Sequence, residues 1–262
     1  MFDYLRRRSK TAGRPPGSPM YVGVERSGPV DIEMITYDAS GAESVKPADL
    51  GECACFGDGP RNTWINIDGL HDMAVNEQAA KVFGIHPLVL EDILHTGQRP
   101  KMEELADGSI FVILKMLTYN EKERTVEDEQ VSFVLGRHYL LTFQERSGGD
   151  VFGEVRRRIL GQKGRTCSLG PDYLMYALLD AIVDHYFVVL ERMGEDIEEV
   201  EEKLLARPRP EQLETLNDLR REALYLRKHI FPLREVVARL EKGGTELIAP
   251  ETIFYLRDLY DH

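Results

Sequence analysis

The chain has 262 residues, 42% of them hydrophobic and 30% charged, a balance typical of a globular protein with one large or two modest domains. The formal net charge of −12 disfavours a nucleic-acid partner, because an acidic surface repels phosphates. The three cysteines are too few for a disulfide framework, and we expect no apolar run close to the ~20 residues that span a membrane.

The first half of the chain alternates between predicted strands and helices. Residues 1–19 are rich in proline, glycine and arginine, which predicts a flexible tail. Asp72 is expected to cap a helix that ends at Gly84, and the polar segment before residue 61 is expected to be a loop. Strands are predicted at 30–37, 63–67, 109–119, 130–135 and 138–143.

The stretch Ile85–Lys101 combines a predicted helix with two adjacent acids. Pro87 suits a first helical position, and Gly97 is expected to end the helix. The apolar residues that share one helical face are Leu90, Ile93 and Leu94. Glu91 and Asp92 lie beside that face, so these carboxylates require either solvent or a cation.

From residue 171 onward the pattern is helical. Apolar residues recur every three or four positions over 186–204 and again over 216–240, with Pro208 and Pro210 between them. This pattern predicts an antiparallel pair of long helices. A third helix is predicted to begin at Pro250. Its periodicity continues to the last residue, so we expect that residue to lie inside a longer helix.

These signals divide the chain into four expected parts. They are a tail at 1–19, an α/β domain at 20–170, a helical hairpin at 171–249 and the start of a further helix at 250–262.

Several short segments follow one another in order along the chain. They include Trp-Ile-Asn-Ile at 64–67, Gly-Ile-His-Pro-Leu-Val-Leu-Glu-Asp-Ile-Leu at 84–94, Gln-Arg-Pro-Lys at 98–101, Glu-Gln-Val-Ser at 129–132 and Leu-Arg-Asp-Leu-Tyr-Asp-His at 256–262. This ordered series resembles the cytoplasmic region of the CorA family of divalent-cation channels, and the match is collinear from about residue 20 to the end.

The resemblance implies an α/β/α sandwich with a mixed sheet, followed by long antiparallel helices and the start of a stalk helix. It implies a non-enzymatic Mg²⁺/Co²⁺ transport protein in which five subunits surround one pore. The domain would lie at the cytoplasmic face of the cell membrane. C-terminal helices missing from this sequence would enter the membrane.

The resemblance also implies metal sites between subunits. By motif position Asp92 would face Asp258 of the next subunit, and Glu91 and Asp180 would form a neighbouring site. Asp184, one helical turn after Asp180, could assist. Bound Mg²⁺, or Co²⁺, would act as a regulatory ligand that favours the closed state, because hard divalent ions prefer oxygen ligands.

Several alternatives remain open on the residues alone. Asp180 and Asp184 repel each other at i and i+4, which is typical of a solvated helix face, and Asp261 and His262 have no assigned role. A zinc-transport relative would share the same architecture. A coiled-coil scaffold would explain only the helical half. A metal-dependent hydrolase using Glu91, Asp92 and Asp180 lacks a recognisable nucleophile or phosphate-binding motif.

Overall fold

The computed structural model describes residues 13, 15–24, 27–53, 59, 61–146 and 149–262. The arginines of the predicted tail, at positions 6–8, and Cys55 lie outside these residues. The strands are β1 Asp31–Asp38, β2 Gly41–Val45, β3 Asn62–Asp68, β4 Lys101–Glu104, β5 Ile110–Asn120, β6 Thr125–Leu135 and β7 Tyr139–Gln144. The helices are α2 Met73–Phe83, α3 Pro87–Leu94, α4 Gly153–Leu160, α5 Pro171–Ala206, α6 Pro210–Glu241 and α7 Pro250–Asp261, with 3-10 turns at Leu50–Cys53 and Thr166–Ser168.

The seven strands form one sheet in the order β2-β1-β3-β7-β6-β5-β4. The β3–β7 pair is parallel, and the other pairs in the sheet are antiparallel. The sheet is therefore mixed, as expected.

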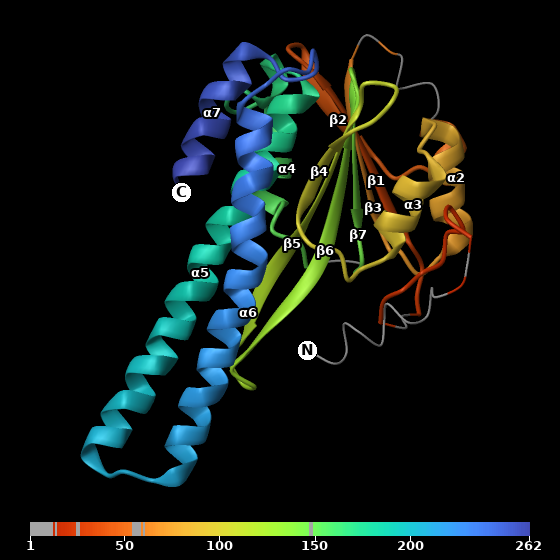
Figure 1. Cartoon of the computed structure of the whole chain (residues 1–262). Coiled ribbons are helices and arrows are strands. Elements are labelled where there is room, and N and C mark those ends of the chain that lie inside the picture. The colour runs from red at the N-terminus through yellow and green to blue at the C-terminus, as the bar shows by residue number, and fades with distance from the viewer. Residues whose placement is uncertain (1–12, 14, 25–26, 54–58, 60, 147–148) are drawn as a thin grey trace.

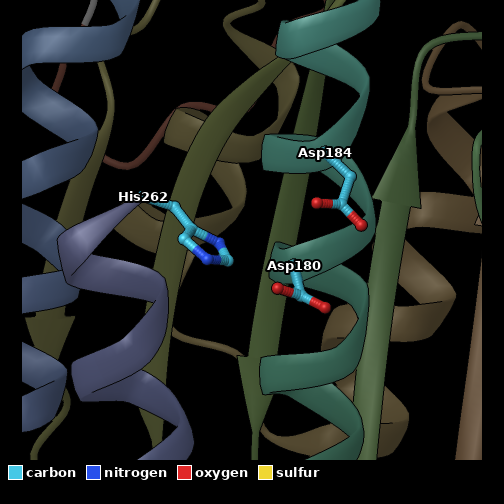
Figure 2. Close-up of side chains that lie close together, drawn as sticks. All are labelled: Asp180, Asp184 and His262. Carbon is cyan, nitrogen blue, oxygen red and sulfur yellow. The ribbon is translucent and has the colours of Figure 1, made fainter.

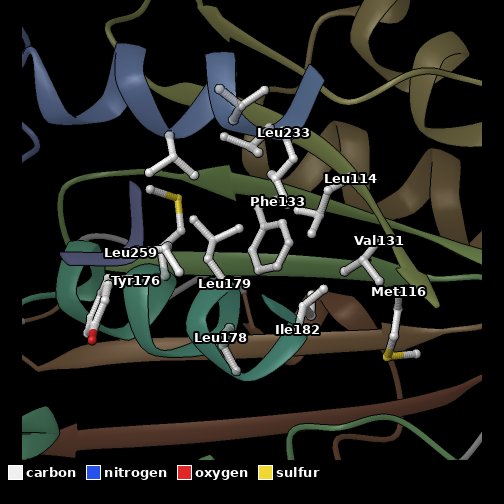
Figure 3. Close-up of a cluster of buried hydrophobic side chains, with 14 of the residues drawn as sticks. Leu114, Met116, Val131, Phe133, Tyr176, Leu178, Leu179, Ile182, Leu233 and Leu259 are labelled. Carbon is white, nitrogen blue, oxygen red and sulfur yellow. The ribbon is translucent and has the colours of Figure 1, made fainter. Parts of the chain in front are cut away.

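Helices cover both faces of the sheet, so the fold has three layers (Figure 1). Along β5, alternate side chains enter opposite cores: Val112 and Leu114 face α5, while Phe111 and Ile113 face α3. Figure 3 shows the larger core, where side chains of β5 and β6 meet those of α5, α6 and α7. The α/β/α sandwich followed by long helices is confirmed.

Two edge strands and several element ends differ from the predictions. The segment expected to be a loop contains β2, and β4 was not predicted. Both strands are short and polar and lie at an edge of the sheet, so their sequences lack an alternating apolar pattern. β6 begins at Thr125, five residues before the expected start, because its first residues are polar.

The two predicted helix signals around Gly84 are confirmed in part. Asp72 accepts hydrogen bonds from the backbone N–H groups of Ala74 and Val75, and Gly84 ends α2 with a left-handed φ of 67°. However, α3 ends at Leu94 rather than near Gly97. The chain leaves the helix early because Thr96 N–H bonds to the carbonyl of Val22 at 3.2 Å.

The long antiparallel helices are α5 and α6, and Pro232 lies inside α6 without ending it. Among the described residues α5 alone has the length and the apolar composition to cross a membrane. The expectation that the chain contains no apolar run close to the length of a membrane span was therefore wrong when judged by composition. The apolar side chains of α5 nevertheless pack in the protein core: Leu178, Leu179 and Ile182 are fully buried against the sheet (Figure 3).

A buried polar cluster lies at the carboxyl ends of the parallel strands β3 and β7. Asp68 Oδ1 accepts hydrogen bonds from Asn66 Nδ2 at 2.7 Å and from Gln144 Nε2 at 2.9 Å. Burial, and then the nearby Asp150 carboxylate, raises the pKa of Asp68 to about 7. The folded protein therefore holds a proton on Asp68 at a pH where the unfolded chain does not.

Asp68→Asn is expected to change how stability depends on pH. Because the pKa is raised in the folded state, its stabilising contribution is complete below pH ~4 and is lost as the pH rises through 7, at about 1.4 kcal/mol per pH unit. The variant should flatten the fall in the free energy of unfolding between pH 5 and 8, measured by urea titration. Asp107→Asn is the control, because the hydrogen bond from Ser109 lowers the pKa of that exposed carboxyl and places its titration below this window. Equal slopes for wild type and Asp68→Asn would contradict the assignment.

Candidate metal centre

Helix α3 presents Glu91 and Asp92 at the edge of one core. His86 caps the helix through Nδ1, which accepts the Leu88 N–H at 3.2 Å, and Pro87 occupies its first turn. The buried face that fixes the helix to the sheet consists of Val89, Leu90, Ile93 and Leu94. Glu91 and Asp92 flank that face and are half-buried.

Both acids of α3 have partners within their own chain. Asp92 Oδ2 pairs with Lys101 Nζ at 2.6 Å, and its Oδ1 accepts a hydrogen bond from Gln98 Nε2 at 2.6 Å. Glu91 Oε2 accepts the backbone N–H of Gly17 at 2.8 Å, so the end of the predicted tail contacts α3. The carboxylates of α3 are held in place.

On the other face of the sheet, a buried carboxylate aligns α7 with α5. Asp172, in the first turn of α5, accepts hydrogen bonds from Ala249 N–H at 2.9 Å and Thr252 Oγ1 at 2.6 Å through Oδ2. Ala249 is the residue that precedes α7 and Thr252 lies in its first turn, so Asp172 joins the start of α7 to the start of α5. The two helices start side by side and run in the same direction (Figure 1).

This common start brings acids of both helices level with one another. Asp180 follows Pro171 by nine residues and Asp258 follows Pro250 by eight, and each residue of a helix advances it by the same rise. One turn further, Asp184 lies on α5 and His262 follows α7. Ligand atoms of Asp180, Asp184 and His262 lie within 4.8 Å of one another, and Figure 2 shows their side chains in the space between the two helices.

The electrostatics of this acidic face favour a cation. Burial, and then the charges of Asp184 and Asp258, raises the pKa of Asp180, while His262 opposes the shift. Burial and the charge of Asp180 also raise the pKa of Tyr176, with Asp258 contributing. A divalent cation would relieve this repulsion between like charges, and carboxylate and imidazole groups are ordinary ligands for such ions.

The sequence-predicted residues therefore lie in two separate groups. Asp92 and Glu91 lie on α3, which packs on one core, and Asp180 and Asp258 lie on α5 and α7, which pack on the other (Figure 1). The sheet separates the members of each predicted pair within one chain. Asp261 is exposed and lines a neighbouring groove of about 330 Å³ between α5, α6 and the end of α7.

Residues 60–262 match the family model described as CorA-like Mg2+ transporter protein. The chain belongs to this family. It is 42% identical over 257 residues to the cobalt/magnesium transport protein CorA of Thermotoga maritima, covering 98% of this chain and 72% of that protein. The family consists of transport proteins rather than enzymes, in agreement with the prediction from the sequence.

Solved structures share the CorA fold. The soluble domain of CorA from Methanocaldococcus jannaschii has a TM-score of 0.70 at 21% identity, over 88% of this chain and 86% of that one. The ZntB cytoplasmic domain from Vibrio parahaemolyticus has a TM-score of 0.66 at 14% identity, over 89% of each chain.

The role of His262 was not assigned from the sequence, although a signal was present. Asp258 and His262 are four residues apart, so they share one helical face. The sequence does not show that this face meets Asp180 and Asp184, because that contact depends on the alignment of α7 with α5.

Asp180→Asn is expected to stabilise the chain slightly in the absence of divalent ions. The substitution removes repulsion from Asp184 and Asp258, which we estimate at about 0.5 kcal/mol. The melting temperature in chelator should therefore rise, while the further increase caused by added Mg²⁺ should shrink. Glu198→Gln, on an exposed part of α5, is the control and should change neither quantity. A lower melting temperature for Asp180→Asn in chelator would show that the carboxylate is structural.

Proposed function

We propose that this chain is the cytosolic ion-sensing part of a homopentameric CorA-type Mg²⁺/Co²⁺ channel. The family match and the relative named as a cobalt/magnesium transport protein support this assignment. In this proposal the domain lies at the cytoplasmic face of the cell membrane. Mg²⁺ acts on the domain as a regulatory ligand, with Co²⁺ as the alternative ion.

The observation that carries the proposal is the separation of the acids onto opposite faces of the sheet. Within one chain Asp92 and Asp258 have the sheet between them. A second copy can bring its α5–α7 face against α3, so that Asp92 faces Asp258 and Glu91 faces Asp180. Such a contact joins two different surfaces, and repeating it around an axis closes a ring.

A cation at this interface would control the association of neighbouring subunits. Two carboxylates about 4 Å apart repel by roughly 4 kcal/mol at an effective dielectric constant near 20. A divalent ion between them converts the repulsion into attraction, and Mg²⁺ needs only one or two carboxylates besides its waters. Occupied sites would hold the ring closed, and their loss would shift the population toward looser subunits.

Asp92→Asn/Asp258→Asn should remove the response of the 262-residue chain to Mg²⁺. In wild type, Mg²⁺ should raise the melting temperature or the sedimentation coefficient, because it binds the ordered interface; at 100 times its dissociation constant the stabilisation is about 2.7 kcal/mol. The double variant should not respond. Glu198→Gln/Glu202→Gln removes two exposed carboxylates of α5 and should respond like wild type. Identical Mg²⁺ titrations of wild type and the Asp92/Asp258 variant would reject the interface site.

A zinc-transport function is the second candidate, and His262 is the observation that favours it. Its imidazole lies with Asp180 and Asp184, and imidazole suits Zn²⁺ and Co²⁺ better than Mg²⁺. The fold is also that of the ZntB cytoplasmic domain.

His262→Gln separates the two ions. Under the leading proposal the variant keeps the Mg²⁺ response, because the carboxylates supply the ligands, and it loses at least about tenfold in Zn²⁺ affinity. Both affinities are measured by calorimetry on the same preparation. Zn²⁺ binding by wild type without any Mg²⁺ response would favour the zinc transporter.

A further inference from the structure

The carboxylate of Asp92 is already bonded to a cation of its own chain. Lys101 Nζ lies 2.6 Å from Asp92 Oδ2, and the two side chains are only 28% and 26% exposed. Gln98 Nε2 occupies the other oxygen at 2.6 Å. The ammonium group of Lys101 therefore stands at one of the positions from which a metal ion would approach this carboxylate.

We propose that Lys101 is a built-in competitor for the divalent cation at Asp92 and sets the ion concentration at which that site fills. The inference rests on the proposed function, because it takes Asp92 as a ligand. An ammonium and a divalent ion repel each other, so binding at Oδ2 requires Lys101 to move away. Lys101 acts here as a positioning residue that modulates affinity and does not contact the metal.

The position of Glu103 supports this exchange. Glu103 Oε1 lies 2.8 Å from the same Lys101 Nζ, and the two residues are two positions apart on β4, so their side chains leave the strand on one side. An ammonium displaced from Asp92 would retain Glu103 as its partner. Glu103 would thereby lower the cost of displacing Lys101.

The charge and placement of Lys101 fit the same role. The ammonium of Lys101 donates hydrogen bonds to the carboxylates of both Asp92 and Glu103. Its Nζ also lies 5.7 Å from the centre of the Phe111 ring, which gives the displaced cation a favourable surface on β5.

The test is a double-mutant cycle followed by Mg²⁺ titration of the full 262-residue chain. The readout is the Mg²⁺ concentration at the midpoint of the rise in melting temperature. Lys101→Met keeps the apolar stem and removes the competitor, so the midpoint should fall about two- to fivefold, the range expected for a partly exposed ion pair. Lys101→Arg retains the charge and should remain close to wild type.

Glu103→Gln distinguishes competition from a general effect of surface charge. Alone, it should raise the midpoint about twofold, because the displaced ammonium loses its second partner. In the Lys101→Met background, Glu103→Gln should leave the midpoint unchanged, because no ammonium group is present to pair with residue 103. An equal shift in both backgrounds would mean that Glu103 attracts the metal directly and would overturn its assigned role.

Asp92→Asn separates failure of this inference from failure of the proposed site. If Asp92→Asn abolishes the Mg²⁺ response while Lys101→Met leaves the midpoint unchanged, the site stands and Lys101 is not a competitor. If Asp92→Asn leaves the response intact, the proposed site is wrong and the inference fails with it. A lower Mg²⁺ midpoint for Lys101→Met, together with a midpoint close to wild type for Lys101→Arg, would support competition.

Discussion

The central strands β5, β6 and β7 bury side chains on both faces, and the arrangement of the whole molecule depends on this. Because Phe111 and Leu114 of one strand enter different cores, helices must cover each face. The helices α2 and α3 cover one face, and α4 to α7 cover the other (Figure 1). The same burial that stabilises the fold thus separates the acids of α3 from those of α5 and α7. In the proposed assembly, these two groups of acids would meet only between copies.

Helix α7 is placed by a polar contact as much as by apolar packing. Leu256 and Leu259 bury its inner face, but Asp172 determines where the helix begins relative to α5. Burial raises the pKa of Asp180, the charge of Asp184 on the same helix adds to the shift, and the alignment brings the charge of Asp258 beside it as well. This repulsion works against the stability of the isolated chain.

Buried side chains bond to the backbone at the end of α3 and in the loop that leads to β4. Lys115, buried between sheet and helices, donates to the carbonyl of Thr96 at 2.6 Å and pairs with Asp128 at 2.7 Å. Gln130 Nε2 donates to the carbonyl of Ile93 at 3.1 Å. Because these buried groups anchor the backbone around the loop, the distance between Asp92 and its lysine is set by the fold. In the proposed site, the ion affinity at Asp92 would then depend on the surrounding side chains rather than on loop motion.

The sequence by itself determined the element types wherever periodicity or capping chemistry was strong. The buried strands, the helix between Asp72 and Gly84, and the long helices follow from local patterns, as does the position of the acid pair on α3. The polar edge strands β2 and β4 have no such pattern, so they were missed. The tertiary structure alone decided that Lys101 pairs with Asp92, and that His262 joins Asp180. These contacts arise from packing and from the hydrogen bonds of Asp172 to the start of α7, and such interactions leave no period in the sequence.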